Sequence, residues 1–168
     1  VFAPLSDGNV LLGTKLAFGK ALRPLVDYSR TKVIVSLDAD FLQVETGAVR
    51  ATKQFAASRR LVTAADTMSR LYVAEAHLST TGANADHRVR VARSQIAKVA
   101  SAIAARLGTK HSVALGEIAQ VAQGSLKVDG VADAWLDAVA KDLADNKGAS
   151  AVVVGAVEPE RCDRDPPG

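Results

Sequence analysis

The chain has 168 residues, of which 48% are hydrophobic and 23% are charged. This composition is typical of a single globular domain and excludes an intrinsically disordered chain. The formal net charge is +3, but acidic and basic residues are interspersed, so we expect no nucleic acid as partner, because that would need a clustered basic face.

The first half of the chain predicts one helix followed by a strand, helix, strand unit. Segment 14–29 has a helical pattern that Pro24 interrupts. KVIVSLD (32–38) and RLYVAEA (70–76) are nearly continuous apolar runs rich in β-branched residues, as in strands covered on both faces. Between them, segment 49–60 predicts a helix with a small apolar stripe formed by Val49, Lys53, Ala56 and Ala57.

The second half predicts three helices and one strand. SQIAKVASAIAARLG (94–108) has apolar residues at helical spacing, with Ser94 as a candidate cap and Gly108 as a candidate end. Shorter helical patterns follow at 113–124 and 129–148, and SAVVVGA (150–156) predicts the last strand. The arginines just before the first of these helices, Arg88, Arg90 and Arg93, are consistent with a solvated strand edge and helix start.

This alternation of strands and helices predicts the fold class. We expect an α/β fold, with an open, mainly parallel, three-layer Rossmann-like sheet that has helices on both faces. Residues 1–157 should form one domain and residues 158–168 an unstructured tail. Because the chain begins with Val1 and shows no export signal, we expect it to be a fragment of a longer protein.

Candidate site residues lie where the predicted strands end, because ligands of such sheets bind outside the carboxyl ends of the strands. Asp38 and Asp40 follow the first strand and could bind a hard cation together, or could instead cap a turn and face solvent. Glu75 ends the second strand, where an acid can accept hydrogen bonds from ribose hydroxyls. The chain contains neither of the glycine-rich phosphate-binding motifs GxGxxG and GxxxxGKS, and this absence disfavours a dinucleotide enzyme of the common kind.

The loop TTGANADHRVRV (80–91) brings an acid, an imidazole and a guanidinium together in sequence at Asp86, His87 and Arg88. Neighbours in an extended segment point to opposite faces, so Asp86 and His87 are poorly placed to bond each other. The chain has no GxSxG nucleophile motif and no CxxC or HExxH spacing, so we expect neither hydrolysis nor zinc chemistry. A single cysteine, Cys162, cannot hold an iron–sulfur cluster.

The order of these segments resembles a known family. KVIVSLDADFL, GAVRATKQFAASRR, MSRLYVAEAHLSTTGANADHRVRV and WLDAVAKDL are similar to the large iron–sulfur subunit of the bacterial quinol-oxidising alternative complex III. The similarity runs from about Ala3 to Val157 and covers a region homologous to molybdopterin oxidoreductases. In that family a ferredoxin-like region with cysteine motifs holds the clusters, and this chain has none of those motifs.

The resemblance also implies site residues. In active molybdopterin oxidoreductases, an acid followed by Pro and Arg contacts the guanosine end of the cofactor, and an Ala-Asp pair follows a Thr-rich loop. Glu75 looks like that acid, but Ala76 and His77 stand in place of Pro and Arg. Ala85 and Asp86 together look like that Ala-Asp pair. These departures match the alternative complex III branch, whose corresponding region holds no molybdenum cofactor.

The resemblance implies a non-catalytic scaffold domain of a membrane-associated respiratory electron-transfer complex. Such a domain would hold no cofactor itself, would pack against other subunits without inserting in the membrane, and would lie on the outer, periplasmic face of the cytoplasmic membrane. Iron–sulfur clusters would sit elsewhere in the parent protein. The alternative is a true cofactor-binding domain, with a pocket for the guanosine end of the cofactor lined by Glu75, Thr81, Asp86 and Asp38. A third possibility is a freestanding nucleotide or metal binder that uses Asp38 and Asp40.

Overall fold

The computed structural model describes residues 8–114 and 127–155, and the chain divides into two compact units. One unit comprises Val1–Leu25 and Ala156–Gly168, and the other comprises Val26–Gly155. In the first unit, helix α1 (Gly8–Phe18) is followed by a turn in which the amide of Leu22 donates to the Thr14 hydroxyl at 2.9 Å. The predicted boundary between residues 157 and 158 lies outside the described residues.

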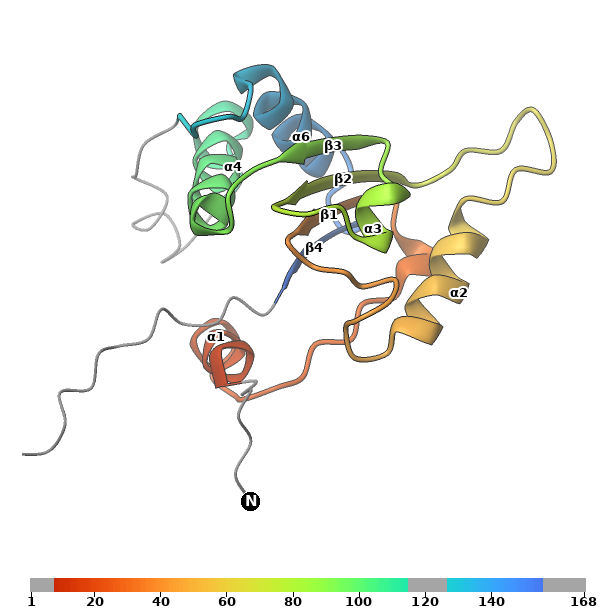
Figure 1. Ribbon diagram of the computed structural model, residues 1–168, viewed down its shortest axis with the longest axis horizontal. Coiled ribbons are helices and arrows are strands. Elements are labelled where there is room, and N and C mark those ends of the chain that lie inside the picture. The colour runs from red at the N-terminus through yellow and green to blue at the C-terminus, as the bar shows by residue number, and fades with distance from the viewer. Residues whose placement is uncertain (1–7, 115–126, 156–168) are drawn as a thin grey trace, which may run out of the picture. The chain divides into compact units, whose positions relative to one another are not determined.

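The second unit is built on a four-stranded, all-parallel sheet, and it has the expected α/β class (Figure 1). The strand order is β3-β2-β1-β4. Its strands are β1 (Val33–Leu37), β2 (Arg70–Glu75), β3 (His87–Arg90) and β4 (Ser150–Val154). Its helices are η1 (Tyr28–Arg30), α2 (Ala48–Ser58), α3 (Thr80–Ala83), η2 (Arg93–Gln95), α4 (Ile96–His111) and α6 (Asp133–Asp145).

Helices cover the two faces of this sheet, which makes it the middle layer of three (Figure 1). One face packs on α2 and η1, where Phe41 stacks on Tyr28 with ring centroids 4.5 Å apart and meets Phe55 edge-on at 5.9 Å. The other face packs on α4 and α6 through residues such as Val35 and Leu136, which are fully buried. All five residues of β1 are buried, which explains its continuous apolar run.

Ion pairs between α4 and α6 hold the second helical layer together. Arg106 of α4 is 6% exposed, and its guanidinium donates to Asp133 at 2.6 Å and to Asp137 at 2.8 Å, both on α6. A buried guanidinium needs such partners, because an unpaired charge in an apolar layer is costly.

Several predicted elements differ in detail from the observed ones. The stripe predicted for α2 is wrong: Val49 is 89% exposed, and the helix instead buries Ala51 and Phe55, four residues apart. The reason is the aromatic cluster beneath α2, which a bulky Phe fills better than small alanines. β3 adds a strand that no apolar run had indicated.

The predicted helix limits are also shifted. The helix expected at 14–29 is α1, which ends at Phe18. Ser94 does not cap α4, because it lies in η2, and α4 passes Gly108 to end before Ser112, whose φ is +53°. The last helix begins at Asp133, after a turn that contains Gly130 with φ +78°. Most of the helix predicted at 113–124 lies outside the described residues.

Candidate functional site

The carboxyl ends of β1 and β2 place acidic side chains side by side at one edge of the sheet. Leu37 of β1 pairs with Ala74 of β2, so the residues that follow, Asp38 and Glu75, lie at the same edge of the sheet. The amide of Asp38 donates to the Ala74 carbonyl at 2.8 Å, which extends the ladder by one bond. Both acids therefore lie where the sequence places them, at the carboxyl ends of two neighbouring strands.

Glu75 is the most enclosed of these acids, with a side chain only 3% exposed. Its Oε2 accepts from the Ser79 hydroxyl at 2.6 Å, and its Oε1 accepts from the Ser79 amide at 3.3 Å and from Arg88 Nε at 2.5 Å. Arg88 comes from the neighbouring strand β3. Both carboxylate oxygens are thus engaged by groups of the protein itself.

Asp38 is held in a comparable way. It adopts a left-handed backbone conformation with φ +52°, and its carboxylate accepts from the Ala76 amide at 3.3 Å and from Arg93 Nε at 2.7 Å. The Asp38 side chain is 5% exposed, whereas Arg93 is 54% exposed. The arginine therefore covers the acid from the solvent side.

Asp40 has its own partners and does not pair with Asp38. Its Oδ1 accepts from the Thr81 amide at 3.0 Å and from the Thr81 hydroxyl at 2.7 Å, and the same hydroxyl oxygen accepts from the Leu42 amide at 3.2 Å. The two aspartates thus fix two different loops. Among residues 8–114 and 127–155 no group of three or more histidines, cysteines, aspartates or glutamates is placed to hold a metal ion.

The backbone of two glycines packs closely against Glu75 and Asp38 at this edge. A Cβ on Gly82 of α3 would lie 1.8 Å from Glu75 Oε1, and a Cβ on Gly155 would lie 2.0 Å from the Asp38 carbonyl oxygen. Only glycine permits such close approach. We call Asp38, Asp40, Glu75, Ser79, Thr81, Arg88 and Arg93 the carboxyl-edge network.

Asp86 lies at the opposite end of the sheet from the other predicted site residues. Its carboxylate binds Arg59 through two bonds of 2.7 Å and accepts the amide of Leu71 near the start of β2 at 2.8 Å. Leu71 and Glu75 are four residues apart in a strand, or about 13 Å. The structure thus brings Glu75, Thr81 and Asp38 together but places Asp86 elsewhere.

The ion pair with Arg59 also changes the titration of Asp86. The hydrogen bonds from the Arg59 guanidinium lower the pKa of the Asp86 carboxyl below its usual value, with a smaller contribution from the Leu71 amide. Partial burial acts in the opposite direction but does not reverse the shift. Asp86 is therefore a structural anion that connects α2 to the sheet.

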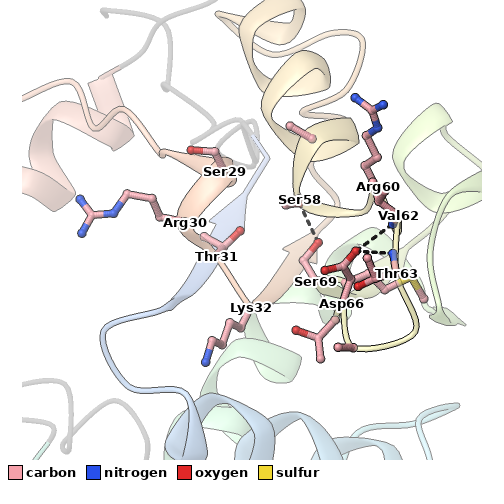
Figure 2. A pocket seen from close by; sticks show the side chains of 14 residues that line it. Ser29, Arg30, Thr31, Lys32, Ser58, Arg60, Val62, Thr63, Asp66 and Ser69 are labelled. Carbon is pink, nitrogen blue, oxygen red and sulfur yellow. Dashed lines mark hydrogen bonds between the residues drawn. The ribbon is translucent and has the colours of Figure 1, made fainter.

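A second site lies at the amino ends of β1 and β2 and was not predicted from the sequence. Here a pocket of about 750 Å³ is bounded by residues 29–32, the end of α2 and the loop before β2 (Figure 2). We call it the amino-end pocket; it is lined by Ser29, Arg30, Thr31, Lys32, Ala57, Ser58, Arg60, Val62, Thr63, Ala65, Asp66, Thr67, Met68 and Ser69. The only sequence signal was a high density of basic and hydroxyl residues in two separate segments.

Comparisons with known proteins add no family assignment. Neither the scan against protein-family models nor the search of curated proteins found a match. In the part of the chain that the structure describes, no helix is both long and apolar enough to cross a membrane.

Proposed function

We propose that this chain is a non-catalytic scaffold domain of a membrane-associated respiratory electron-transfer complex. It resembles the molybdopterin-oxidoreductase-like region of the large iron–sulfur subunit of alternative complex III. In this proposal the domain holds no cluster, packs against other subunits at the outer face of the cytoplasmic membrane, and leaves electron transfer to clusters elsewhere in the parent protein.

The observation that carries the proposal is that the Glu75 carboxylate is buried and already bonded within the protein. This residue looks like the acid that contacts the guanosine end of the cofactor in active members of the resembled family. Here its carboxylate is 3% exposed and bonded at both oxygens by Ser79 and Arg88. To bind a nucleotide through this carboxylate, the domain would have to weaken its bond to Arg88, a partner that is 28% exposed, at a cost of about 2 kcal/mol.

The contact between Asp38 and Ala76 supports the same conclusion. Active relatives have Pro after the acid, and Pro has no amide hydrogen to donate. In this chain the Ala76 amide donates to Asp38 Oδ1. The presence of Ala76 in place of Pro thus supplies a hydrogen bond that joins the residue after β2 to Asp38 after β1.

The alternative function, a cofactor-binding domain, fits the described residues poorly. Of its four expected residues, Asp86 is separated from the others and is engaged by Arg59. Thr81 is completely buried, and its hydroxyl is used by Asp40 and Leu42. The polar groups of this set are thus engaged by partners within the protein, which favours the scaffold proposal.

The direct test is recovery of the tagged chain from its native host. The scaffold proposal expects it in the membrane fraction, in an assembly that contains iron–sulfur clusters visible by electron paramagnetic resonance and that oxidises quinol. A chain recovered without iron from the soluble fraction would contradict the proposal.

A calorimetric titration with GDP and GMP separates the proposal from its alternative. We expect no heat of binding from the folded wild type or from Glu75→Gln. Asp129 is exposed, so the substitution Asp129→Asn removes one carboxylate away from Glu75 and serves as the matched control. Micromolar binding that is lost only in Glu75→Gln would favour the cofactor-binding domain instead.

A further inference from the structure

Strand β4 lies at one margin of the sheet and is paired on one side only (Figure 1). Among residues 8–114 and 127–155, β1 is the strand that pairs with it, and no strand pairs with its other side. The amide of Gly155, just after β4, donates to the Leu37 carbonyl of β1 at 3.0 Å. Backbone groups alternate in direction along a strand, so those of Val152 and Val154 point away from β1.

The two marginal strands of the sheet differ in charge. β3 carries Arg88 and Arg90, and cations on an edge strand oppose its pairing with a second copy of the same strand. β4 has the sequence SAVVV, which contains no charged residue and no proline. It therefore lacks the side chains by which natural edge strands avoid pairing with other strands.

The valines of β4 continue the apolar core to this margin. Val152 lies beside Val35 of β1 and Val154 lies beside Leu37, so their side chains are on the face that packs on α4 and α6. The two residues of β1 are 0% and 1% exposed, whereas Val152 is 51% and Val154 is 50% exposed. In the part of the chain that the structure describes, the helical layer thus covers β1 and leaves the β4 valines half uncovered.

We propose that β4 is a dimerisation edge, at which two copies of this chain join their sheets by antiparallel pairing of β4 with β4. The two-fold axis passes through Val152, which exchanges backbone hydrogen bonds with the same residue of the other copy. Val154 of each copy pairs with Ser150 of the other. This arrangement satisfies the outward amides and carbonyls of both strands and brings their valines into cross-strand contact.

Symmetry and charge favour a second copy in this position. Pairing of β4 with itself uses the same surface on both molecules and is complete with two copies. Pairing of β4 with β3 of another molecule would instead leave a free edge at each end and would allow open-ended growth. Because β4 is uncharged, no like charges meet on the axis. The dimer does not involve the carboxyl-edge network and goes beyond the scaffold proposal.

Sedimentation equilibrium of the whole chain tests whether the dimer forms. The buffer contains a reductant, so that Cys162 cannot cross-link two chains. A short strand buries little surface, so we expect a weak dimer, with a mean mass that rises from one chain towards two between about 10 µM and about 1 mM. A mass that stays at one chain up to about 1 mM, or that grows beyond two chains, would overturn the proposal.

Amide hydrogen exchange tests which surface is used. The outward amides of Val152 and Val154 should exchange rapidly in dilute samples and become protected as the dimer forms. The amide of Val153, which points towards β1, should be protected at both concentrations. Full protection of Val152 and Val154 in dilute, monomeric samples would mean that another segment of the same chain covers β4, and the proposal would then be wrong.

Opposite charges at Val152 test the position of the axis. Val152→Lys and Val152→Glu each place two like charges opposite one another, so each should weaken the dimer at least about tenfold. An equimolar mixture of the two variants should restore it, because Lys then faces Glu. Val49→Lys, at a residue of α2 that is 89% exposed, is the matched control and should leave the dimer unchanged.

Amide spectra of the variants verify that they are folded, as expected for a side chain that is half exposed. Dimerisation of folded Val152→Lys with the wild-type constant would contradict the proposal. So would a mixture of the Lys and Glu variants that stays monomeric, since the axis would then lie elsewhere. Equal weakening by Val49→Lys would show that added positive charge anywhere on the surface, rather than charge at β4, opposes association.

Discussion

The two ends of the parallel sheet use the same residue types in opposite ways. At the carboxyl end, acids and arginines pair with one another, and glycine backbone packs closely against two of the acids. At the amino end, a pocket of about 750 Å³ is lined mainly by hydroxyl, basic and small side chains from two segments of the chain. In open α/β sheets the carboxyl end is the usual place for ligands. Here the acids at the conventional binding position are engaged by internal partners, whereas the pocket described above lies at the opposite end.

This difference shows that charged residues do not by themselves mark a binding site. Asp38 and Glu75 are buried, and each has an arginine partner from a later segment of the chain. Lys32 and Arg60 are exposed and lie beside a cavity. What matters is whether the hydrogen-bonding capacity of a side chain is already used, and that depends on tertiary contacts.

The largest expected loss of stability comes from a substitution that forces the backbone apart at the carboxyl end of the sheet. Gly155→Ala would place a Cβ 2.0 Å from the Asp38 carbonyl oxygen, so backbone must move. We expect a loss of about 3 kcal/mol in the free energy of unfolding, at the upper end of overpacking effects. Urea unfolding measures it. Gly13→Ala, whose Cβ meets nothing within 4 Å, is the control and should cause no loss.

A smaller effect is expected when the Glu75 charge is removed without changing its shape. Glu75→Gln weakens the bond to Arg88, a partner that is 28% exposed and can turn partly to water. We expect a loss of about 2 kcal/mol in the free energy of unfolding, as for a buried hydrogen bond to a charged group. A change below about 0.5 kcal/mol, the range of ordinary surface substitutions, would mean that the carboxyl-edge network does not stabilise the fold.

At the amino end, Asp86 gives a pH-dependent effect. Its pKa is lowered in the folded state, so its stabilisation is present above the unfolded pKa of about 3.9 and is lost as the pH falls through the folded value. At neutral pH we expect Asp86→Asn to cost about 1 kcal/mol, because the pair is partly exposed. The gap between wild type and variant should narrow below about pH 4. A gap that is constant in urea unfolding across pH 3–7 would contradict this role.

The sequence predicted the fold class and three of the four strands because β1, β2 and β4 are continuous apolar runs. β3 (His87–Arg90) was not among the predicted strands, because it has no apolar run, although its alternating arginines were consistent with a solvated strand edge. The meeting of Asp38 and Glu75 followed from their positions at strand ends. Their arginine partners could not be predicted, since they depend on where β3 and η2 pack.

The position of Asp86 has a topological reason. Because β3 runs parallel to β2, the chain must return to the amino end of the sheet before β3 begins. Asp86, directly before His87, is therefore carried away from Glu75. The amino-end pocket could not be predicted from the sequence for a similar reason, because its lining comes from two segments that only the folded sheet brings together.

The two sides of β1 acquire their partner strands at different times during synthesis, because β4 lies much later in the sequence than β2. Val33 pairs with Ser150, which lies 117 positions later in the sequence. At about 5–20 residues per second, one side of β1 waits roughly 6 to 23 seconds for its partner. The other side of β1 faces β2 much earlier, since Val33 pairs there with Arg70. The late-filled side is thus the one most open to strands of neighbouring nascent chains, and the pace of translation sets how long that exposure lasts.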